Sequence, residues 1–251
     1  MQAVAEARTN IALVKYWGKR DTALNLPATG SLSLTLDGLG TRTTVSFADG
    51  DRDRVQLDGA PADERTAARV LALVGRVRER AGVSAWAEVV SHNSVPTASG
   101  LASSASGFAA LAVATVRAAG LTLSAGELSE LARTGSGSAA RSIFGGFVEM
   151  ARGERADGRD AVAVPIDGSE AWSDLRLVVA VTSEARKAIG STEAMERTAR
   201  TSPYYPAWLA GVDGDLRAAR AAIAARDLGA LGAVAERSAL RMHASAMAAF
   251  Q

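Results

Sequence analysis

The spacing of apolar and polar residues predicts both strands and helices in the first half of the chain. Residues 43–48 and 54–57 alternate apolar and polar side chains on either side of an Asp-Gly-Asp turn, which predicts a β-hairpin. Apolar residues recur at helical spacing over residues 62–80, and residues 87–91 favour a strand. The apolar stretch 107–119 is shorter than the roughly 18–20 residues of a membrane span, so it predicts a buried helix.

The second half of the chain continues this mixture. Ser124 and Glu127 form a capping box that starts a helix, and residues 145–150 resemble the entry to a strand. The nearly all-apolar residues 175–181 predict a buried strand. Helical spacing predicts two further helices, over residues 207–225 and 228–242. Strands and helices mix without a regular β-α-β alternation, which favours an α+β fold over a doubly wound parallel sheet.

Composition and charge exclude several classes of protein. The 251 residues include no cysteine, so disulfides and thiolate metal sites are excluded, and a reducing cytoplasm is the expected location. His92 and His243 lie far apart, which argues against a histidine-rich metal site, and we expect His243 to pack on the last helix. A net charge of +1 gives no general attraction to nucleic acid or to an anionic membrane. No signal-peptide pattern and no membrane-length apolar run is found.

A Gly/Ser-rich segment precedes the predicted buried helix. Residues 95–107 read VPTASGLASSASG, and such small residues let the backbone approach a ligand closely. The free N–H groups and dipole of the following helix, together with the serine hydroxyls, suit a phosphate chain and its magnesium. The segment is not a Walker A loop, because no Gly-Lys-Ser/Thr closes it. On composition alone, a turn that merely caps the helix remains the alternative.

Two further clusters have residue types that bind anions. Of 28 basic residues only three are lysine, and two of these, Lys15 and Lys19, lie four residues apart beside Tyr16 and Trp17. If this segment were helical, the two lysines would share a face and could hold a diphosphate; the alternative is a solvated basic turn. A second Gly/Ser loop, GSGSAARS, contains Arg141, whose guanidinium fits a pair of carboxylate or phosphate oxygens. The alternative for that loop is a flexible linker.

These segments together resemble the mevalonate diphosphate decarboxylases, a branch of the GHMP kinase superfamily. The matching stretches are NIALVKYWGKRD (10–21), LNLPATGSLSLTL (24–36), NSVPTASGLASSASGFAAL (93–111) and GSGSAARSIFGGF (135–147), with looser matches at KAIGSTEAM (187–195) and ERSALRMHA (236–244). They occur in the family's order and run nearly from end to end of the chain. The KYWGK and SGSAxRS blocks are specific to this branch, whereas the phosphate loop alone indicates only a GHMP-type protein.

The resemblance implies a fold and a reaction. The fold is α+β, with an N-terminal nucleotide- and substrate-binding domain (1–168) containing a left-handed crossover and an incomplete ferredoxin-like C-terminal domain (169–251). In the reaction, ATP with Mg²⁺ phosphorylates the 3-hydroxyl of mevalonate 5-diphosphate. Phosphate and CO2 then leave, giving isopentenyl diphosphate and ADP in the mevalonate pathway of isoprenoid biosynthesis. The family is commonly dimeric, which favours a homodimer.

The resemblance also implies roles for individual residues. Those implied to be catalytic are Lys15, Ser104 and Arg141. Those implied to bind the substrate are Tyr16, Lys19, Ser136, Ser138, Arg141 and Ser191. Those implied to bind the nucleotide are Ser99, Gly100, Leu101, Ala102, Ser103, Ser104 and Lys187. No metal-ligating residue is implied.

The chain departs from the family pattern in several places. The family's late Asp-Ala-Gly-Pro-Asn block, whose aspartate is thought to deprotonate or orient the 3-hydroxyl, is not found in this sequence. We therefore expect either a truncated chain, with an exposed sheet edge, or a protein without the usual base. Gly190, Ser238 and Arg241 replace a common serine, an asparagine and a small residue, respectively. Two alternatives therefore stay open: a related GHMP kinase that does not decarboxylate, and a non-catalytic homologue.

Overall fold

The chain forms two compact units that are built from interleaved segments. The computed structural model describes residues 1–94, 103–167, 172, 174–180 and 189–250. Unit 1 consists of Met1–Asn10 and Leu36–Ile143, and unit 2 of Ile11–Thr35 and Phe144–Gln251. Two long strands, β1 (Gln2–Val14) and β4 (Ser31–Ala48), contribute residues to both units.

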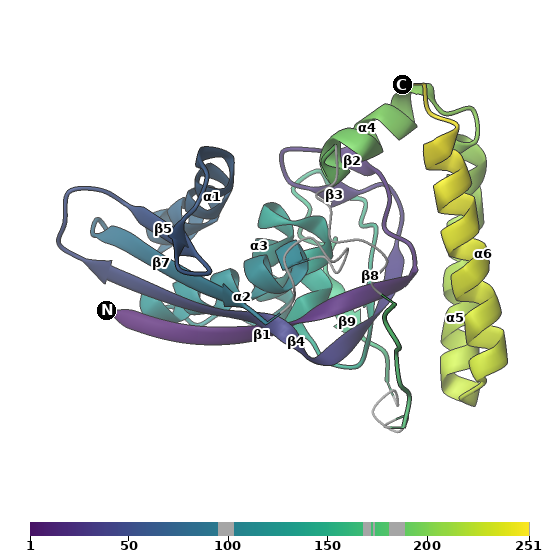
Figure 1. Ribbon diagram of the computed structural model, residues 1–251, viewed down its shortest axis with the longest axis horizontal. Coiled ribbons are helices and arrows are strands. Elements are labelled where there is room, and N and C mark those ends of the chain that lie inside the picture. Colours follow the sequence, from purple (N-terminus) through teal and green to yellow (C-terminus); the bar gives the residue numbers. More distant parts are fainter. Residues whose placement is uncertain (95–102, 168–171, 173, 181–188, 251) are drawn as a thin grey trace. The chain divides into compact units, whose positions relative to one another are not determined.

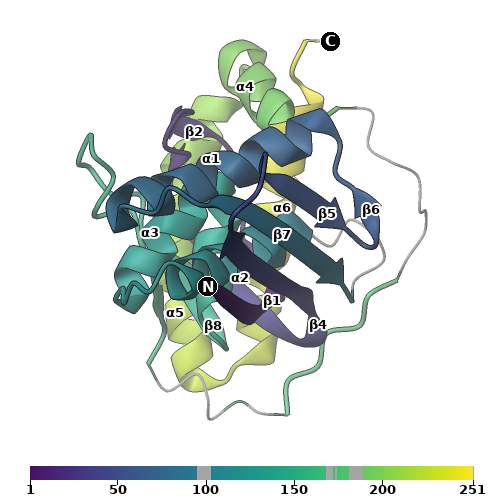
Figure 2. The same cartoon turned by 90° about the vertical axis from the view of Figure 1, so that its left-hand side faces the viewer.

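The sheet of unit 1 places β7 (Trp86–Asn93) between β4 and β5 (Arg54–Leu57). β7 runs antiparallel to β4 and parallel to β5, while β6 (Ala60–Pro61) pairs with the outer edge of β5 and β1 pairs with β4 (Figure 2). The two strands of the predicted hairpin exist, but the prediction that they pair with each other is wrong. Helix α1 (Glu64–Ala81) connects β5 to β7 as a parallel crossover, which places β7 between β4 and β5.

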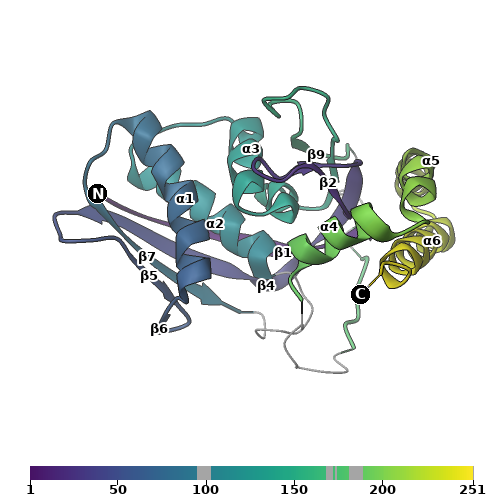
Figure 3. The same ribbon diagram turned by 90° about the horizontal axis from the view of Figure 1, so that it is seen from above.

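Helices cover one face of this sheet. Residues of β7 alternate between buried positions (Ala87, Val89 and Ser91) and exposed ones (Trp86 and Glu88). The helices on this face are α1, α2 (Ser103–Ala118) and α3 (Ala125–Gly135) (Figure 3). Ala87 and Val89 belong to the hydrophobic core that these helices help to form. The predictions of an amphipathic first helix and a buried second helix are confirmed. The segment after α3, predicted as a loop, is instead a 3-10 helix, η1 (Gly137–Ile143).

Unit 2 combines short strands with three helices. β8 (Phe147–Met150) pairs with the first residues of β4 and with β9 (Ala163–Pro165), and β2 (Lys19–Asp21) and β3 (Leu26–Pro27) form a separate two-stranded sheet. The helices are α4 (Ser191–Thr201), α5 (Tyr205–Ala225) and α6 (Leu228–Met247). α5 and α6 lie side by side (Figure 1), and their apolar faces build the core of this unit. The last two predicted helices are confirmed, although α6 continues beyond residue 242.

Two expectations for unit 2 are wrong. Residues 175–180 of the predicted buried strand form no regular structure, and Val178 is 93% exposed; Val181 lies outside the described residues. An apolar run forms a stable strand only where a neighbouring strand accepts its backbone hydrogen bonds, and no described strand lies beside this one. His243 is exposed on α6 rather than packed, because the buried face of this helix contains Met242 and Ser245.

Within the described ranges, none of the helices has the length and apolar character that crossing a membrane requires.

The predicted capping box at the start of α3 is confirmed, and it generates a pH prediction. The hydrogen bond from Arg80 to Glu127, at 2.7 Å, and the Ser124 backbone and hydroxyl donors lower the pKa of Glu127 from 4.5 to about 2. Because the folded-state pKa lies below the unfolded one, this stabilisation is complete above pH 4.5 and is lost as the pH falls toward 2.

We therefore expect Glu127→Gln to remove part of the decline in stability between pH 5 and pH 3. Urea unfolding at several pH values measures this decline in the free energy of unfolding. Glu130→Gln on the same helix is the control, because that side chain makes none of these hydrogen bonds. A wild-type chain whose stability declines no more steeply than that of Glu127→Gln would contradict the assignment.

The end of α3 depends on a close approach between Gly135 and Phe108. A Cβ atom at Gly135 would overlap the Phe108 ring, whereas one at Gly126, on the same helix, would meet nothing within 4 Å. We expect Gly135→Ala to lower the free energy of unfolding by about 1–3 kcal/mol through overpacking. Gly126→Ala should leave it unchanged or raise it by up to ~1 kcal/mol. Urea unfolding of both variants checks this, and equal stabilities would show that the Phe108 ring moves aside at no cost.

Candidate active site

In unit 1, the predicted site residues gather where α2 begins and α3 ends. Ser136, the C-cap residue of α3, donates through Oγ to Ser104 Oγ at 3.4 Å. The Ser136 and Ser138 hydroxyls are 3.2 Å apart. The two Gly/Ser segments, about thirty residues apart in sequence, are therefore in direct contact through their hydroxyls. Ser103 opens α2 beside Ser104.

Arg141 is the most deeply buried of the predicted site residues. Its side chain is 1% exposed on η1, and its Nη2 donates to Asn10 Oδ1 at 3.2 Å. The Asn10 amide nitrogen in turn donates to the Ser138 carbonyl at 3.0 Å and to Ser142 Oγ at 2.7 Å. Removing a guanidinium from water is costly, so a buried arginine needs such partners. Asn10 therefore orients both Arg141 and the segment that carries Ser138.

A second buried hydroxyl cluster fixes the first turn of α2. Ser106 Oγ lies 2.8 Å from Thr41 Oγ1 on β4 and accepts from Thr9 Oγ1 on β1 at 3.3 Å. Ser106 also donates to the Ser103 carbonyl at 3.3 Å. All three hydroxyl residues are buried, so their hydrogen bonds hold the start of the helix to the sheet.

In unit 2, Lys19 reaches the first turn of α4. Its Nζ donates to Thr192 Oγ1 at 2.9 Å, next to the predicted substrate residue Ser191. The N-cap of α4 is Gly190, which offers no side-chain cap, and its φ of −72° is that of an ordinary N-cap. An acidic side chain, Glu193, lies in the same first turn and pairs with Arg197 at 3.2 Å. Lys19 and the free N–H groups of this turn are the donors that an anion could bind here.

Lys15 and Lys19 do not share a helical face. Lys15 follows β1, with its Nζ donating to the Ala12 carbonyl at 2.9 Å and its backbone N–H donating to Ser238 Oγ at 3.0 Å. Lys19 begins β2. The condition of a helical segment is therefore not met, and the two ammonium groups have separate partners.

The turn between these lysines packs on the start of α5. Gly18 has φ of +99°, and the Tyr205 hydroxyl group occupies the place where a Cβ atom would lie. Burial raises the pKa of the Tyr205 hydroxyl. Tyr16 and Trp17 are both half-buried, and Trp17 packs against the core of unit 2, while its Nε1 has no hydrogen-bond partner within the described part of the chain.

Several residues that shape these clusters were not predicted from the sequence. Asn10, Thr9, Thr41 and Thr192 were not proposed, although Asn10 opens the NIALVKYWGKRD block and an asparagine within an apolar strand is itself a signal of a buried polar contact. Five other predicted nucleotide-binding residues lie outside the described residues: Ser99, Gly100, Leu101, Ala102 and Lys187.

Comparisons with known proteins follow the same segments. Residues 7–163 match the family model of the diphosphomevalonate decarboxylase-like N-terminal domain, and residues 177–251 match that of the mevalonate 5-diphosphate decarboxylase C-terminal domain. A diphosphomevalonate decarboxylase of Ganoderma lucidum is 39% identical over 262 residues. That match covers 98% of this chain but 66% of the relative, so the chain spans just under two thirds of this relative's length.

Solved structures give the same result for the fold. A structure described as MDDEF in complex with MVAPP, AMPPCP and magnesium has a TM-score of 0.90 and 41% identity, covering 99% of this chain and 76% of that one. The mevalonate diphosphate decarboxylase of Staphylococcus aureus has a TM-score of 0.89 and 41% identity, with the same coverage. The predicted α+β fold of the GHMP kinase type is thus confirmed. Two domain models of one family match this chain, and its alignments with these relatives cover nearly all of its own length. The chain therefore belongs to the diphosphomevalonate decarboxylase family.

Proposed function

We propose that this chain catalyses the ATP-dependent decarboxylation of mevalonate 5-diphosphate to isopentenyl diphosphate, ADP, phosphate and CO2. Membership of the family supports this reaction, as does the related structure described with MVAPP, AMPPCP and magnesium. The observation that carries the proposal is the Lys19 ammonium group held beside the free N–H groups at the first turn of α4, where the one acidic side chain, Glu193, is paired with Arg197.

The chemistry explains why such a protein needs several anion-binding groups. A tertiary hydroxyl is a poor leaving group, and its phosphorylation by ATP makes it a good one. Loss of that phosphate builds positive charge on the carbon atom, and the departing carboxylate relieves this charge as CO2. A site for this reaction must hold a diphosphate, a carboxylate and a triphosphate with preorganised donors.

The resemblance assigns the diphosphate of the substrate to Tyr16, Lys19 and Ser191. Lys19 provides an ammonium group, Tyr16 a hydroxyl, and the first turn of α4 provides Ser191 together with free backbone N–H groups. The Lys19 side chain is only partly buried, so it can exchange its hydrogen bond to Thr192 for one to a phosphate oxygen.

The resemblance assigns the carboxylate and hydroxyl end of the substrate to Ser136, Ser138 and Arg141. Arg141 is oriented by Asn10, and Ser136 and Ser138 place two hydroxyls 3.2 Å apart near it on the same segment. A guanidinium that is already desolvated binds a carboxylate without a further loss of water, which favours charge stabilisation during the reaction.

The nucleotide is assigned to the start of α2. Ser103 and Ser104 bring hydroxyls to this helix N-terminus, and no acidic residue lies in its first turn to repel a phosphate. We propose that Mg²⁺ arrives with ATP, as the related structure described with AMPPCP and magnesium suggests. Lys15 and Ser104 keep the catalytic roles implied by the resemblance, and Lys187 and the 99–102 segment keep their nucleotide contacts, as part of this proposal.

The proposal is tested by following ADP and CO2 separately while the chain acts on mevalonate 5-diphosphate with ATP and Mg²⁺. Equal amounts of both products are expected. ADP without CO2 would instead indicate a kinase that stops after phosphate transfer. Neither product, with nucleotide still bound, would overturn the proposed activity for this chain.

Arg141→Lys tests the role of the buried guanidinium. We expect turnover to fall by about 100-fold or more, because a lysine cannot replace the planar fork that contacts Asn10 and the substrate. ATP binding, measured by calorimetry, should stay within about twofold of wild type, since a factor of two is only ~0.4 kcal/mol. Arg42→Lys serves as the control, because the Arg42 side chain is 63% exposed. Near-normal turnover in Arg141→Lys would remove this residue from the mechanism.

A further inference from the structure

The hairpin that carries Lys19 is short. Outside the strand pairing, the Leu24 N–H donates to Asp21 Oδ1 at 2.8 Å and the Ala28 N–H to the Gly18 carbonyl at 3.1 Å. β2 and β3 contain three and two residues, and their pairing is irregular between Lys19 and Asp21. Lys19 pairs with Pro27, which has no backbone N–H to donate. A two-stranded hairpin of this size is marginal in water. Other contacts must therefore fix the direction of the Lys19 side chain.

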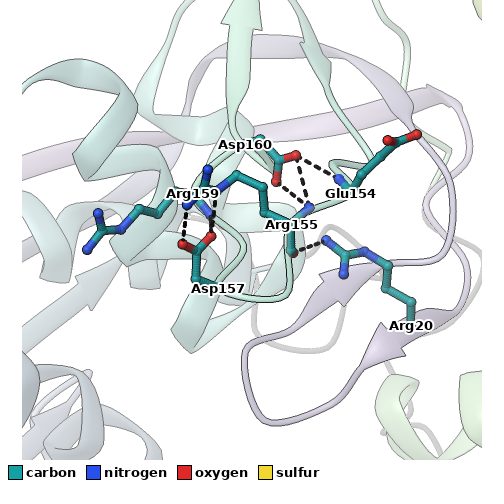
Figure 4. Close-up of polar contacts among 6 residues, drawn as sticks. All are labelled: Arg20, Glu154, Arg155, Asp157, Arg159 and Asp160. Atoms are coloured by element: carbon teal, nitrogen blue, oxygen red, sulfur yellow. Dashed lines mark hydrogen bonds and ion pairs between the residues drawn. The ribbon is translucent and has the colours of Figure 1, made fainter.

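Residues 152–160, called here the 152–160 loop, bind both strands of this hairpin. From β2, Arg20 Nη2 donates to the Arg155 carbonyl at 2.9 Å (Figure 4). From the loop, Arg152 Nε donates to the carbonyl of Ala28, the residue after β3, at 3.1 Å. The hairpin is thus attached to one loop through two arginines that reach in opposite directions.

The 152–160 loop is itself held in shape by two carboxylates. Asp160 accepts hydrogen bonds from the backbone N–H groups of Glu154, at 2.7 Å, and Arg155, at 3.1 Å, as Figure 4 shows. The Arg155 guanidinium binds Asp157 through two nitrogens, at 2.6 and 2.9 Å. Gly153 has φ of +65°, and a Cβ atom there would come within 2.6 Å of Asp160 Oδ1.

Both carboxylates are ionised at neutral pH. The backbone N–H of Glu154 is the main cause that lowers the pKa of Asp160, and Arg20 adds to it electrostatically. The Arg155 guanidinium lowers the pKa of Asp157. The carbonyl that receives Arg20 is therefore presented by a loop whose charged contacts persist over the physiological range of pH.

We propose that Arg20 is a positioning residue for the proposed reaction, which holds Lys19 toward the substrate diphosphate through its bond to the 152–160 loop. Successive side chains of a strand point to opposite faces, so Arg20 reaches the loop while Lys19 reaches Thr192. The inference rests on the proposed function only for the ligand that Lys19 receives. The attachment of the hairpin to the loop is independent of it.

The test compares Arg20→Met and Asp160→Ala with Arg159→Met, the matched control. Arg159 lies on the same loop, and its side chain takes no part in the contacts that hold the hairpin. We expect the first two variants to raise the KM and Kd for mevalonate 5-diphosphate about tenfold. A change of this size corresponds to the loss of one charge-assisted hydrogen bond. Their kcat and their KM for ATP should stay within about twofold of wild type, or ~0.4 kcal/mol. Arg159→Met should match wild type, and unchanged affinity in Arg20→Met would overturn the inference.

A double-mutant cycle separates positioning from direct contact. If Arg20 acts through Lys19, Arg20→Met should have no further effect on affinity in a Lys19→Gln background. A full additional loss there would mean that Arg20 contacts the substrate itself, and would overturn the positioning role. Arg20→Lys should restore part of the affinity, because an ammonium group can still donate to the Arg155 carbonyl.

Hydrogen exchange separates a failure of this inference from a failure of the proposed function. Backbone amides of residues 19–28 should exchange faster in Arg20→Met and Asp160→Ala than in Arg159→Met, with no substrate present. Faster exchange without any binding of mevalonate 5-diphosphate by wild type would sink the proposed function while keeping the attachment of the hairpin. Unchanged exchange would sink the attachment, whatever the chain binds.

Discussion

The geometry of the candidate site in unit 1 depends on the hydrogen bonds of the Asn10 side-chain amide. This amide links β1 to the segment after α3 through three hydrogen bonds, to Arg141, to the Ser138 carbonyl and to Ser142. A fully buried guanidinium is tolerated only where such partners are already in place. The contact therefore stabilises the fold and orients Arg141 for an anionic ligand at the same time.

Unit 2 holds a partly buried cation. The Lys19 ammonium group lies at the N-terminal turn of α4, which also contains Glu193. The short β2–β3 hairpin by itself does little to fix this lysine. The contacts of Arg20 and Arg152 with the 152–160 loop supply the missing rigidity. Two adjacent residues of β2 therefore have different roles. Lys19 is proposed to bind the ligand, and Arg20 attaches the hairpin to the loop.

The predicted helices could be found from the sequence, whereas β1, β9 and α4 were not predicted, and the wrong expectations about strands concern their partners. The strands at 43–48 and 54–57 follow from alternation, but their pairing depends on β7, which arrives about thirty residues later and lies between them. The apolar run 175–180 predicted a strand, yet a strand also needs a neighbour for its backbone groups. His243 was expected to pack but is exposed, because packing on α5 decides which face of α6 is buried.

By itself, the sequence determined the amphipathic helices, the capping box of α3 and the blocks that identify the family, because local spacing and short motifs record them directly. It also indicated which loops have hydroxyl, ammonium and guanidinium groups suited to anions. Only the tertiary structure decided that Asn10 orients Arg141, that Thr192 receives Lys19 and that the 152–160 loop holds the hairpin through Arg20. Each of these contacts joins residues more than a hundred positions apart, and no local pattern records a hydrogen bond between such distant segments.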